Sequence, residues 1–414
     1  MKKIFFLLMT LGWLSAIQAQ WIQQNSGTTE TLGDVFCVTA DTVVVVGSNG
    51  TILRTTNGGN HWNSVTNPAT EHLFRVQFID TQIGFITGLN GTLLRSIDAG
   101  QTWQSLNTGT TEGLSALSCI SNDTIYVAGT NGYISKTTDG GQTWNDISIP
   151  NMQDKYIIRM QFIGSTGYVV LSSNNSSQKL FKTTDDGLHW TEMNNYSSVN
   201  DFVMLNNNTG YISISNGINF TNDGFITVSL IGYTSSYFYN YNLDYLPSDT
   251  LWTVGYGGTT NHVDNAIIKL NIGTGNSETY SCDLYDKTFY AIDFYNAHTG
   301  YVVGVGHNNQ DTYGLILKNS TGDNPQNGID EISKEVFTIS PNPAKNQVSI
   351  NLKDKSTPNP VQYRITDLQG KELTPFTALQ TGKAIDVSRL NNGIYLIQVQ
   401  TNGQVYTQKL LIQK

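Results

Sequence analysis

The side chains of this chain that could carry out hydrolytic chemistry are carboxylates. A glycosidase needs two carboxyl groups at a fixed separation, because one protonates the leaving group while the other attacks the sugar or activates water. The sequence contains many acidic residues before residue 330, among them Asp201, Asp244, Asp264, Asp283 and Asp293. No spacing among these acids marks a pair. The sequence therefore leaves a hydrolase open and predicts no catalytic residue.

Other reactive centres have recognisable local patterns, and the sequence contains none of those we sought. HExxH, GxSxG, P-loop and EF-hand motifs are absent. The 6 His residues are too scattered to suggest a metal, and the 3 cysteines (Cys37, Cys119 and Cys282) show no CxxC spacing. Cys37 and Cys119 lie in apolar segments, where buried free thiols are typical. We expect no metal and no cofactor.

The elements that would position a site follow from a repeat. Four nonamers are near-copies of one another: RTTNGGNHW (54–62), RSIDAGQTW (95–103), KTTDGGQTW (136–144) and KTTDDGLHW (182–190). Their Trp residues lie 41, 41 and 46 residues apart, which is the period of a four-stranded propeller blade. A short Asx side chain can bond nearby backbone amides, a Gly supplies positive φ, and the Trp pins the turn into a core. The structural positions are Thr55, Asn57, Gly59, Trp62, Ser96, Asp98, Gly100, Trp103, Thr137, Asp139, Gly141, Trp144, Thr183, Asp185, Gly187 and Trp190.

The nonamer resembles the Asp-box, the turn motif of sialidase-like and photosystem-assembly-factor-like β-propellers. Seven units are indicated by regularly spaced third strands: GTILR (50–54), GTLLR (91–95), GYISK (132–136), QKLFK (178–182), NGINF (216–220), NAIIK (265–269) and GLILK (314–318). A fifth box, FTNDGFIT (220–227), keeps Asn222 and Gly224 but lacks the Trp. The last two boxes keep little beyond a Gly.

The seventh unit has no fourth strand of its own, and the N-terminal segment supplies a candidate. WIQQNSGTTE (21–30) matches WQSLNTGTTE (103–112), the segment that begins at the Trp of the second box. Trp21 therefore occupies a box-Trp position with no box before it. We predict an all-β, seven-bladed β-propeller with Asp-box turns, whose N-terminal strand completes the last blade and closes the ring.

The number and position of the arginines indicate whether sialidase activity is expected. The resemblance implies three arginines around a bound carboxylate, but the expected propeller has only Arg54, Arg75, Arg95 and Arg159. Arg54 and Arg95 directly precede boxes, at a position that other units fill with Lys, so a structural role is expected. The two remaining arginines cannot form a triad. Sialidase activity is therefore not expected.

A ligand-binding face is better supported by loop length. In propellers, the loop between the second and third strands shares a face with the connection between blades. This loop is minimal in the first three units but expands to SSNNSSQ (172–178), YGGTTNHVD (256–264) and HNNQDTY (307–313), and the link at 233–245 is rich in Tyr. Aromatic rings beside polar groups can hold sugars or peptides, although these tyrosines could instead simply alternate on a strand. The predicted ligand-binding residues are Tyr237, Tyr239, Tyr241, His262, Asp264, His307, Asp311 and Tyr313.

The C-terminal region has a different pattern, which is β-rich and carries no box. Its segments SPNPA, DLQGKEL and NGIYLIQV resemble, in that order, the type A C-terminal sorting domain, which directs Bacteroidetes proteins through the type IX secretion system. The resemblance implies a small C-terminal β-sandwich at 335–414 and the type IX machinery as partner. An ordinary sandwich would use the same turn residues. The motif positions are Pro341, Asn342, Pro343, Gly370, Gly393 and Tyr395.

The N-terminal segment indicates where the protein is localised, and the charge distribution limits which partners it can bind. Residues 1–19 read as a secretory signal peptide, with Lys2 and Lys3 before a short apolar run. Residues 20–330 carry 11 Lys and Arg against 26 Asp and Glu, a balance of −15, which argues against nucleic acid as a ligand. No later apolar stretch is long enough to span a membrane. We expect a propeller at 20–322, a linker at 323–334 and the sorting domain at 335–414, in a secreted or cell-surface protein.

Two functions of different classes fit these features. The first is a non-catalytic propeller that binds a glycan or a protein. The alternative is a secreted propeller-type glycoside hydrolase, and an assembly-factor-like scaffold is a weaker third possibility. The sequence does not name the ligand.

Overall fold

The computed structural model describes residues 20–414 with internal gaps. The residues outside the described part of the chain are 1–19, 174–175, 194–195, 197, 215–216, 234–237, 248–249, 260–261, 281–286, 309–310, 321–336, 343, 353–360, 367–371, 381–382, 392 and 402–403. The chain divides into two compact units, Met1–Asp323 and Asn324–Lys414. No helix within the described ranges has both the length and the apolar character needed to cross a membrane.

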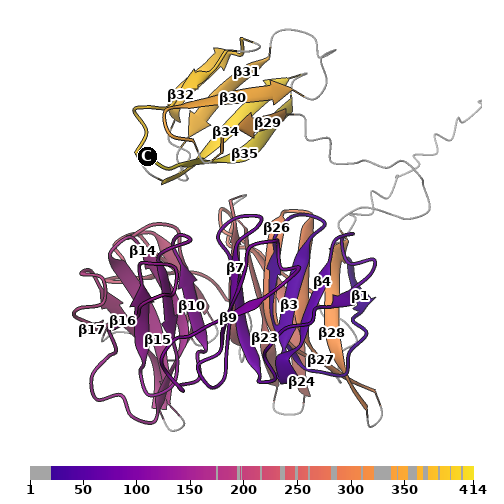
Figure 1. The fold of residues 1–414 in the computed structure, drawn as a ribbon. Helices are drawn as coiled ribbons and strands as arrows, with labels where there is room; N and C mark the ends of the chain where they lie inside the picture. The colour runs from indigo at the N-terminus through magenta and orange to yellow at the C-terminus, as the bar shows by residue number, and fades with distance from the viewer. Residues whose placement is uncertain are drawn as a thin grey trace, which may run out of the picture. The chain divides into compact units, whose positions relative to one another are not determined.

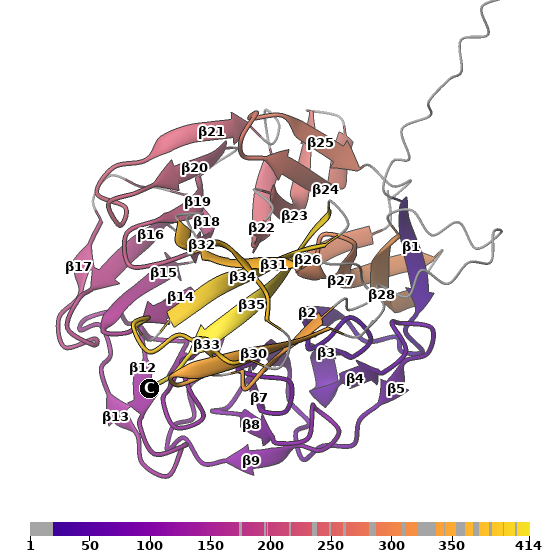
Figure 2. The ribbon, with the colours of Figure 1, turned by 90° about the horizontal axis from the view of Figure 1, so that it is seen from above.

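The first unit is built from four-stranded antiparallel sheets, seven of them among its described residues. In six sheets the strands are adjacent in chain order, and Figure 2 shows the sheets following one another around a centre. A single 3-10 turn, η1 (Ser48–Gly50), joins two strands of the first sheet. The first two sheets contain β2 (Leu32–Cys37), β3 (Val43–Gly47), β4 (Ile52–Thr55) and β5 (Asn63–Ser64), and then β6 (Leu73–Phe78), β7 (Gly84–Gly88), β8 (Leu93–Ser96) and β9 (Gln104–Leu106). The third and fourth contain β10 (Ala116–Cys119), β11 (Ile125–Ala128), β12 (Ile134–Thr137) and β13 (Asn145–Asp146), and then β14 (Lys155–Ile163), β15 (Thr166–Ser173), β16 (Ser176–Thr183) and β17 (Thr191–Glu192). The fifth and sixth contain β18 (Val199–Met204), β19 (Gly210–Ile214), β20 (Gly217–Thr221) and β21 (Ser229–Tyr233), and then β22 (Phe238–Leu246), β23 (Thr250–Thr259), β24 (His262–Asn271) and β25 (Ser277–Tyr280).

The seventh sheet joins the two ends of this unit. It contains β26 (Lys287–Asn296), β27 (Thr299–Asn308), β28 (Asp311–Ser320) and β1 (Gln20–Asn25), and β1 pairs antiparallel with β28 (Figure 1). Trp21 lies opposite Asn319, and its ring packs edge-on against Trp252 and Phe294, with centroids 5.8 Å and 5.9 Å away. The pairing that the sequence predicts for the N-terminal strand is confirmed. An edge of the last sheet that would otherwise be open is thereby covered.

The box turns are held by their own side chains. In the second box, Ser96 Oγ donates to Asp98 Oδ1 at 2.8 Å and accepts from the Gly100 amide at 2.9 Å, while the Thr102 amide donates to Asp98 Oδ1 at 2.9 Å. The other three boxes repeat this pattern. Gly100 adopts φ 78, in the region that favours glycine. The Trp103 ring then packs edge-on against Phe78, with centroids 5.8 Å apart.

The fifth box differs from the sequence reading, which placed its Asx residue at Asn222. Asp223 holds this turn instead, because it accepts from the Thr227 amide at 2.9 Å and from the Thr221 hydroxyl at 2.9 Å. Phe225 stands where the other boxes have glycine, at φ 64, and its amide donates to Thr221 Oγ1. Its ring is fully buried against Tyr168 and Phe202. The missing Trp is therefore replaced by an aromatic ring three positions earlier.

The loops expected between second and third strands are extended hairpins in the later sheets. β23 and β24 are each 10 residues long and pair from Thr250↔Asn271 to Thr259↔His262, and β27 and β28 run together to Asn308↔Asp311. The expectation of long loops at 172–178, 256–264 and 307–313 is thus wrong in detail. The described residues there continue the ladder although Ser, Asn and Gly are not strand-prone, because pairing satisfies backbone groups that a loop would leave to water.

The second unit contains two antiparallel sheets. One comprises β29 (Phe337–Ser340), β30 (Gln347–Leu352) and β33 (Ile385–Asp386). The other has the order β32 (Glu372–Ala378), β31 (Gln362–Thr366), β34 (Gly393–Thr401) and β35 (Gln404–Ile412). Buried residues of both sheets, including Phe337, Val348, Ile365, Ile397 and Leu410, form one apolar cluster. This unit therefore has a core of its own.

Candidate functional site

The first strands of the seven sheets line a central channel, a cavity of about 280 Å³ that collects most of the unit's buried charge. Its lining includes the acids Asp34, Asp201, Asp244 and Asp293 and the bases Arg75 and Arg159. A hydrolase would need two of these acids to face a bound substrate. The hydrogen bonds of each acid therefore decide whether the channel can be catalytic.

Each channel acid accepts a backbone amide from the next sheet. Asp34 Oδ2 accepts from Val76, Asp201 Oδ2 from Leu243 and Asp244 Oδ2 from Phe294, each at 2.8 Å. Asp293 Oδ2 accepts from the Cys37 amide at 2.6 Å, so this junction joins the last sheet to the first. The three remaining junctions use the polar side chains Gln77, Ser118 and Gln161 in the same way, and Asn242 adds a second bond at the junction of Asp244. These side-chain bonds, which we call latches, cross all seven junctions.

The channel arginines are also engaged within the protein. Arg159 Nε lies 2.7 Å from Asp201 Oδ1, and Arg75 Nη1 lies 3.5 Å from Asp34 Oδ1. Both guanidinium groups also donate to the carbonyl oxygen of Ile158, at 2.9 Å and 3.3 Å. The positive groups of the channel are thus directed at acids and at the backbone.

Burial raises the pKa of three channel acids, Asp34, Asp244 and Asp293. Removal from water raises the pKa of Asp34 to about 7 and that of Asp293 to about 6. The pKa of Asp244 is raised well above its usual value by burial and by the nearby charge of Asp293. Raised carboxyl pKa values occur in catalytic sites and in buried structural networks. Because every acid here holds a backbone amide, the arrangement is a structural network between sheets.

The arginines at the ends of third strands have structural partners as well. Arg54 Nε donates to the carbonyl oxygen of Ala99, in the box of the following sheet, at 2.8 Å. Arg95 donates to Asn122 Oδ1. Both contacts join neighbouring sheets, in agreement with the structural role expected from the sequence.

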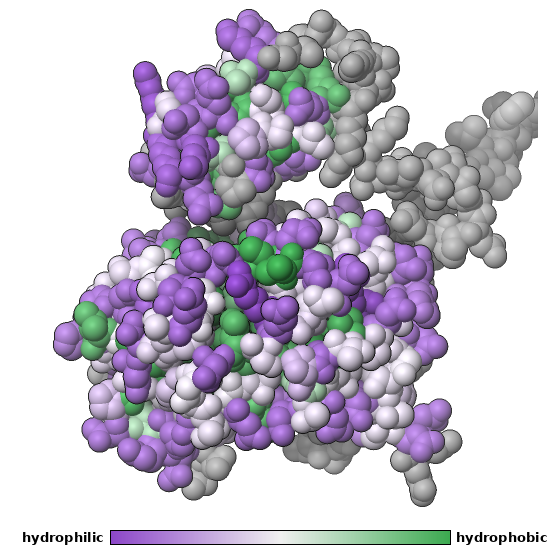
Figure 3. All heavy atoms as spheres, in the orientation of Figure 1, coloured by the Kyte–Doolittle hydropathy of each residue, from purple (hydrophilic) through white to green (hydrophobic). Residues whose placement is uncertain are grey.

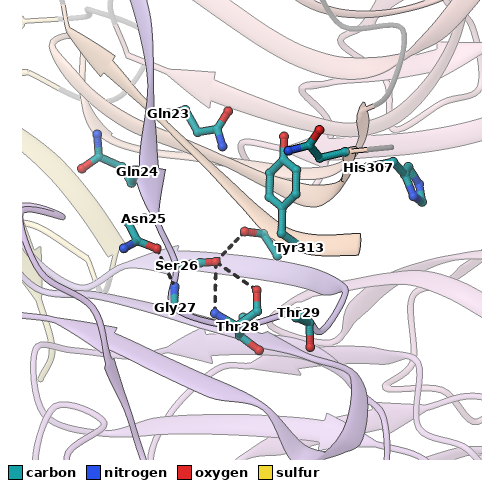
Figure 4. A pocket seen from close by; sticks show the side chains of 11 residues that line it. Gln23, Gln24, Asn25, Ser26, Gly27, Thr28, Thr29, His307 and Tyr313 are labelled. Carbon is teal, nitrogen blue, oxygen red and sulfur yellow. Dashed lines mark hydrogen bonds between the residues drawn. The ribbon is translucent and has the colours of Figure 1, made fainter. Parts of the chain in front are cut away.

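A second cavity lies at the seam where the chain closes on itself (Figure 4). This seam cleft, of about 1010 Å³, lies between the β1–β2 connection and the β27–β28 hairpin. Ser26 Oγ donates to the Gly314 carbonyl at 2.6 Å, and the Gly314 amide donates to the Thr28 carbonyl at 2.9 Å. The lining residues are Gln23, Gln24, Asn25, Ser26, Gly27, Thr28, Thr29, His307, Asn308, Tyr313 and Gly314.

The residues predicted to bind ligand are not all brought together. His307 and Tyr313 line the seam cleft, whereas Asp311 is exposed at the start of β28 and lies outside the lining. Tyr239 and Tyr241 lie on β22, and His262 and Asp264 on β24, but their side chains fall outside the described part of the structure. Tyr237 is outside the described residues. The link read as a connection is thus partly strand, as the alternative reading of the tyrosines proposed.

Sequence reasoning missed the half of the cleft that the N-terminal segment supplies. Gln23, Asn25, Ser26 and Thr28 come from β1 and the turn after it. The signal was present, because an N-terminal strand beside residues 314–318 also brings the turn after it beside the hairpin at 307–313.

The surface offers few other binding features. Within the described residues, no group of three or more His, Cys, Asp or Glu side chains could hold a metal ion. The face seen in Figure 3 is largely hydrophilic or neutral with isolated apolar spots, and the more exposed apolar side chains include Ile97, Leu188 and Ile226 of separate box turns. Single apolar side chains of this kind are normal on a soluble surface.

The motif residues of the second unit stabilise its edges. Asn342 Oδ1 accepts from the Leu411 amide at 2.7 Å, and the Tyr395 hydroxyl donates to the Asn391 carbonyl at 3.0 Å. Pro341 is exposed after a cis peptide bond, and Gly393 begins β34 at φ 154, which only glycine adopts readily. Pro343 and Gly370 lie outside the described residues.

The repeated sheets and box turns define the first unit as a β-propeller with BNR-like repeats, and a family match identifies the second unit as a type IX C-terminal sorting domain. Residues 338–413 match the secretion system C-terminal sorting domain. Residues 14–110 match the photosynthesis system II assembly factor YCF48, and residues 91–225 match sortilin, neurotensin receptor 3. The sorting domain implies secretion or display at the cell surface. None of the curated proteins compared with the chain matches it.

Solved structures support the propeller fold. YCF48 bound to D1 peptide is 20% identical with a TM-score of 0.57, covering 74% of this chain and 98% of that chain. YCF48 from Cyanidioschyzon merolae is 15% identical with a TM-score of 0.55, covering 74% and 99%. The GH74 xyloglucanase from Xanthomonas campestris is 12% identical with a TM-score of 0.56, covering 94% of this chain and 69% of that chain. Identities this low show the fold alone.

Proposed function

We propose that this protein is a non-catalytic binding protein, exported by the type IX secretion system, whose ligand is a glycan or a protein. Residues 1–19 act as signal peptide, residues 20–322 form a closed seven-bladed Asp-box propeller, and residues 335–414 form the sorting sandwich after a linker at 323–334. The ligand-binding face is the one that carries the seam cleft. Partners are the secretion machinery and this ligand, without nucleic acid.

The observation that carries the proposal is the contrast between the two cavities. The channel acids, which a hydrolase would need for catalysis, each accept a hydrogen bond from a backbone amide of the neighbouring sheet. The seam cleft is instead open, polar and held in shape by backbone contacts such as Gly314 to Thr28. A pre-formed cleft on a rigid scaffold favours recognition, because little ordering accompanies binding.

A glycoside hydrolase is the second candidate. The raised pKa of Asp34, about 7, is of the kind that a general acid needs, and the fold is shared with a xyloglucanase. The latch role of each acid weighs against it, since an acid that holds the scaffold cannot turn toward a substrate without breaking a sheet junction.

One experiment separates the two functions. The purified mature chain is screened for binding to glycan and protein panels, and every glycan that binds is assayed for reducing-end release. We expect binding without release of product. Hydrolysis that disappears in Asp201→Asn or Asp244→Asn would overturn the proposal in favour of the hydrolase.

A further inference from the structure

The seam cleft is lined without a single formal charge in a chain whose net charge is −9. Its eleven lining residues include no Asp, Glu, Lys or Arg. The nearest acids along the chain point elsewhere or lie at the edge: Glu30 Oε2 accepts from Asn49 Nδ2 at 2.8 Å, and Asp311 is exposed beyond the lining. A charged ligand would therefore lose hydration in the cleft without meeting an opposite charge.

Tyr313 supplies a fixed aromatic surface in this cleft. It pairs across the strands with Gly306, and a Cβ added to Gly306 would lie 2.3 Å from Tyr313 Cζ, so the ring lies against the bare backbone. The ring also packs against the apolar cluster that contains Trp21. Tyr313 is partly exposed, and Figure 4 shows its ring within the cleft, on the same side as His307. A ring held in this way can stack on a ligand at low entropic cost.

Neutral polar groups surround this ring. The backbones of Gln23, His307 and Asn308 belong to paired strands, whereas their side chains are exposed, so the side-chain donors and acceptors face solvent or a ligand. Asn25 uses its carbonyl oxygen for the Gly27 amide at 3.1 Å, which leaves its NH2 group to donate outward. Side-chain amides offer a donor and an acceptor side by side, as neighbouring sugar hydroxyls require.

The strand that carries Tyr313 offers no open edge to a peptide. β28, which carries Tyr313, is paired with β1 on one side and with β27 on the other. The turn after β1 is tied down by the bonds of Ser26 and Thr28 to Gly314. Extended peptides commonly bind by adding a strand to an open edge, and β28 has none, whereas β1, the outer strand of this sheet, pairs with β28 alone. Peptide binding is therefore an outcome that the test below must distinguish.

We infer that the seam cleft binds an uncharged carbohydrate, with one sugar ring stacked on Tyr313 and its hydroxyls bonded by Gln23, Asn25 and Asn308. The inference rests on the proposed binding function and names its ligand class. Gly306 is a positioning residue for the ring, and His307 borders the same sugar.

The test uses calorimetric titration of the full mature chain with neutral cello-, xylo- and manno-oligosaccharides, oligogalacturonates as charged sugars, and a peptide library. We expect binding to at least one neutral series only. Tyr313→Ala should weaken it by about tenfold or more, while Tyr313→Phe, which keeps the ring, should retain most of it. Tyr295→Ala removes a tyrosine that is 48% exposed outside the cleft and should leave affinity unchanged.

If Tyr313→Ala lowers the melting temperature, the double variant Gln23→Ala/His307→Ala tests the same cleft, because neither side chain lies in a core cluster. Neutral-glycan binding that survives both variants overturns the cleft assignment and leaves the binding function standing. Binding of only charged sugars or only peptides overturns the ligand class. No binding to any probe contradicts both the inference and the proposed function.

Discussion

Asp244 is the channel acid whose protonation should be visible in stability. It accepts the Phe294 amide at 2.8 Å, while burial and the charge of Asp293 raise its pKa well above the usual value. Because its folded-state pKa lies above the unfolded value, the fold favours the protonated acid. That contribution is complete below the unfolded pKa of about 3.9 and is lost as the pH rises through the raised pKa.

We therefore expect Asp244→Asn to be more stable than the wild type at pH 8, by about 2–4 °C in Tm, with a difference that shrinks toward pH 4. Asn242 shows that an amide oxygen can serve as a latch, since it accepts the Ile292 amide at 2.8 Å. Asp139 is the control of opposite sign, because hydrogen bonds from Thr143 lower its pKa to about 2. Asp139→Asn should lose stability at pH 8, and scanning calorimetry across pH measures both. A destabilised Asp244→Asn at pH 8 would contradict the latch account.

Residue types alone predicted the box turns but not the fifth one. The sequence reading placed the Asx role at Asn222, because Gly224 follows it at the usual spacing of two residues. The structure uses Asp223 and accepts Phe225 at φ 64, a conformation that is strained for a bulky residue. Burial of its ring offsets that strain, and tertiary packing of this kind is invisible to a local pattern.

At the scale of elements, strand order was more predictable than strand length. The closing strand could be found because Trp21 repeats the Trp of a box. The hairpin of β27 and β28 was read as a loop, because Asn, Gln and Asp at 308–311 resemble a long turn, whereas the paired strands continue to Asn308 and Asp311. The sequence therefore predicted only the half of the seam cleft that the hairpin supplies. His307 and Tyr313 were found from the hairpin, and its N-terminal half was not.

The closing strand makes a sharp prediction about stability. Trp21 is 9% exposed within the cluster of Trp252 and Phe294, whereas its neighbour Ile22, on the same strand, is 43% exposed. Trp21→Ala should therefore destabilise the protein by about 3–5 kcal/mol, and Ile22→Ala by less than about 1 kcal/mol. Urea unfolding of both variants compares them on the same strand. Equal effects would mean that β1 contributes pairing but no core, and that closure matters little.

At the scale of the whole molecule, each unit has its own apolar clusters. The first unit completes its last sheet with β1, from its own N-terminal segment, and its latch bonds return from Asp293 to Cys37. The second unit buries Phe337, Val348 and Ile397 within its own two sheets. The sequence indicated this division, because the box repeat gives way before residue 335 to a β-rich pattern without the box. The type IX sorting match then assigns the second unit to export.

Removing the second unit should therefore separate folding from export. A chain truncated after residue 322 keeps β1 to β28 and every latch, so we expect a cooperatively folded, protease-resistant propeller with a Tm close to that of the full chain. The proposed signal peptide at residues 1–19 would alone specify passage across the inner membrane, so this chain should accumulate in the periplasm while the full chain reaches the surface or the medium. Fractionation and immunoblotting of both chains in the native host, with a periplasmic marker as control, measure the difference. Unchanged secretion of the truncated chain would contradict the sorting assignment. Degradation of the truncated chain would show instead that the propeller depends on the second unit to fold.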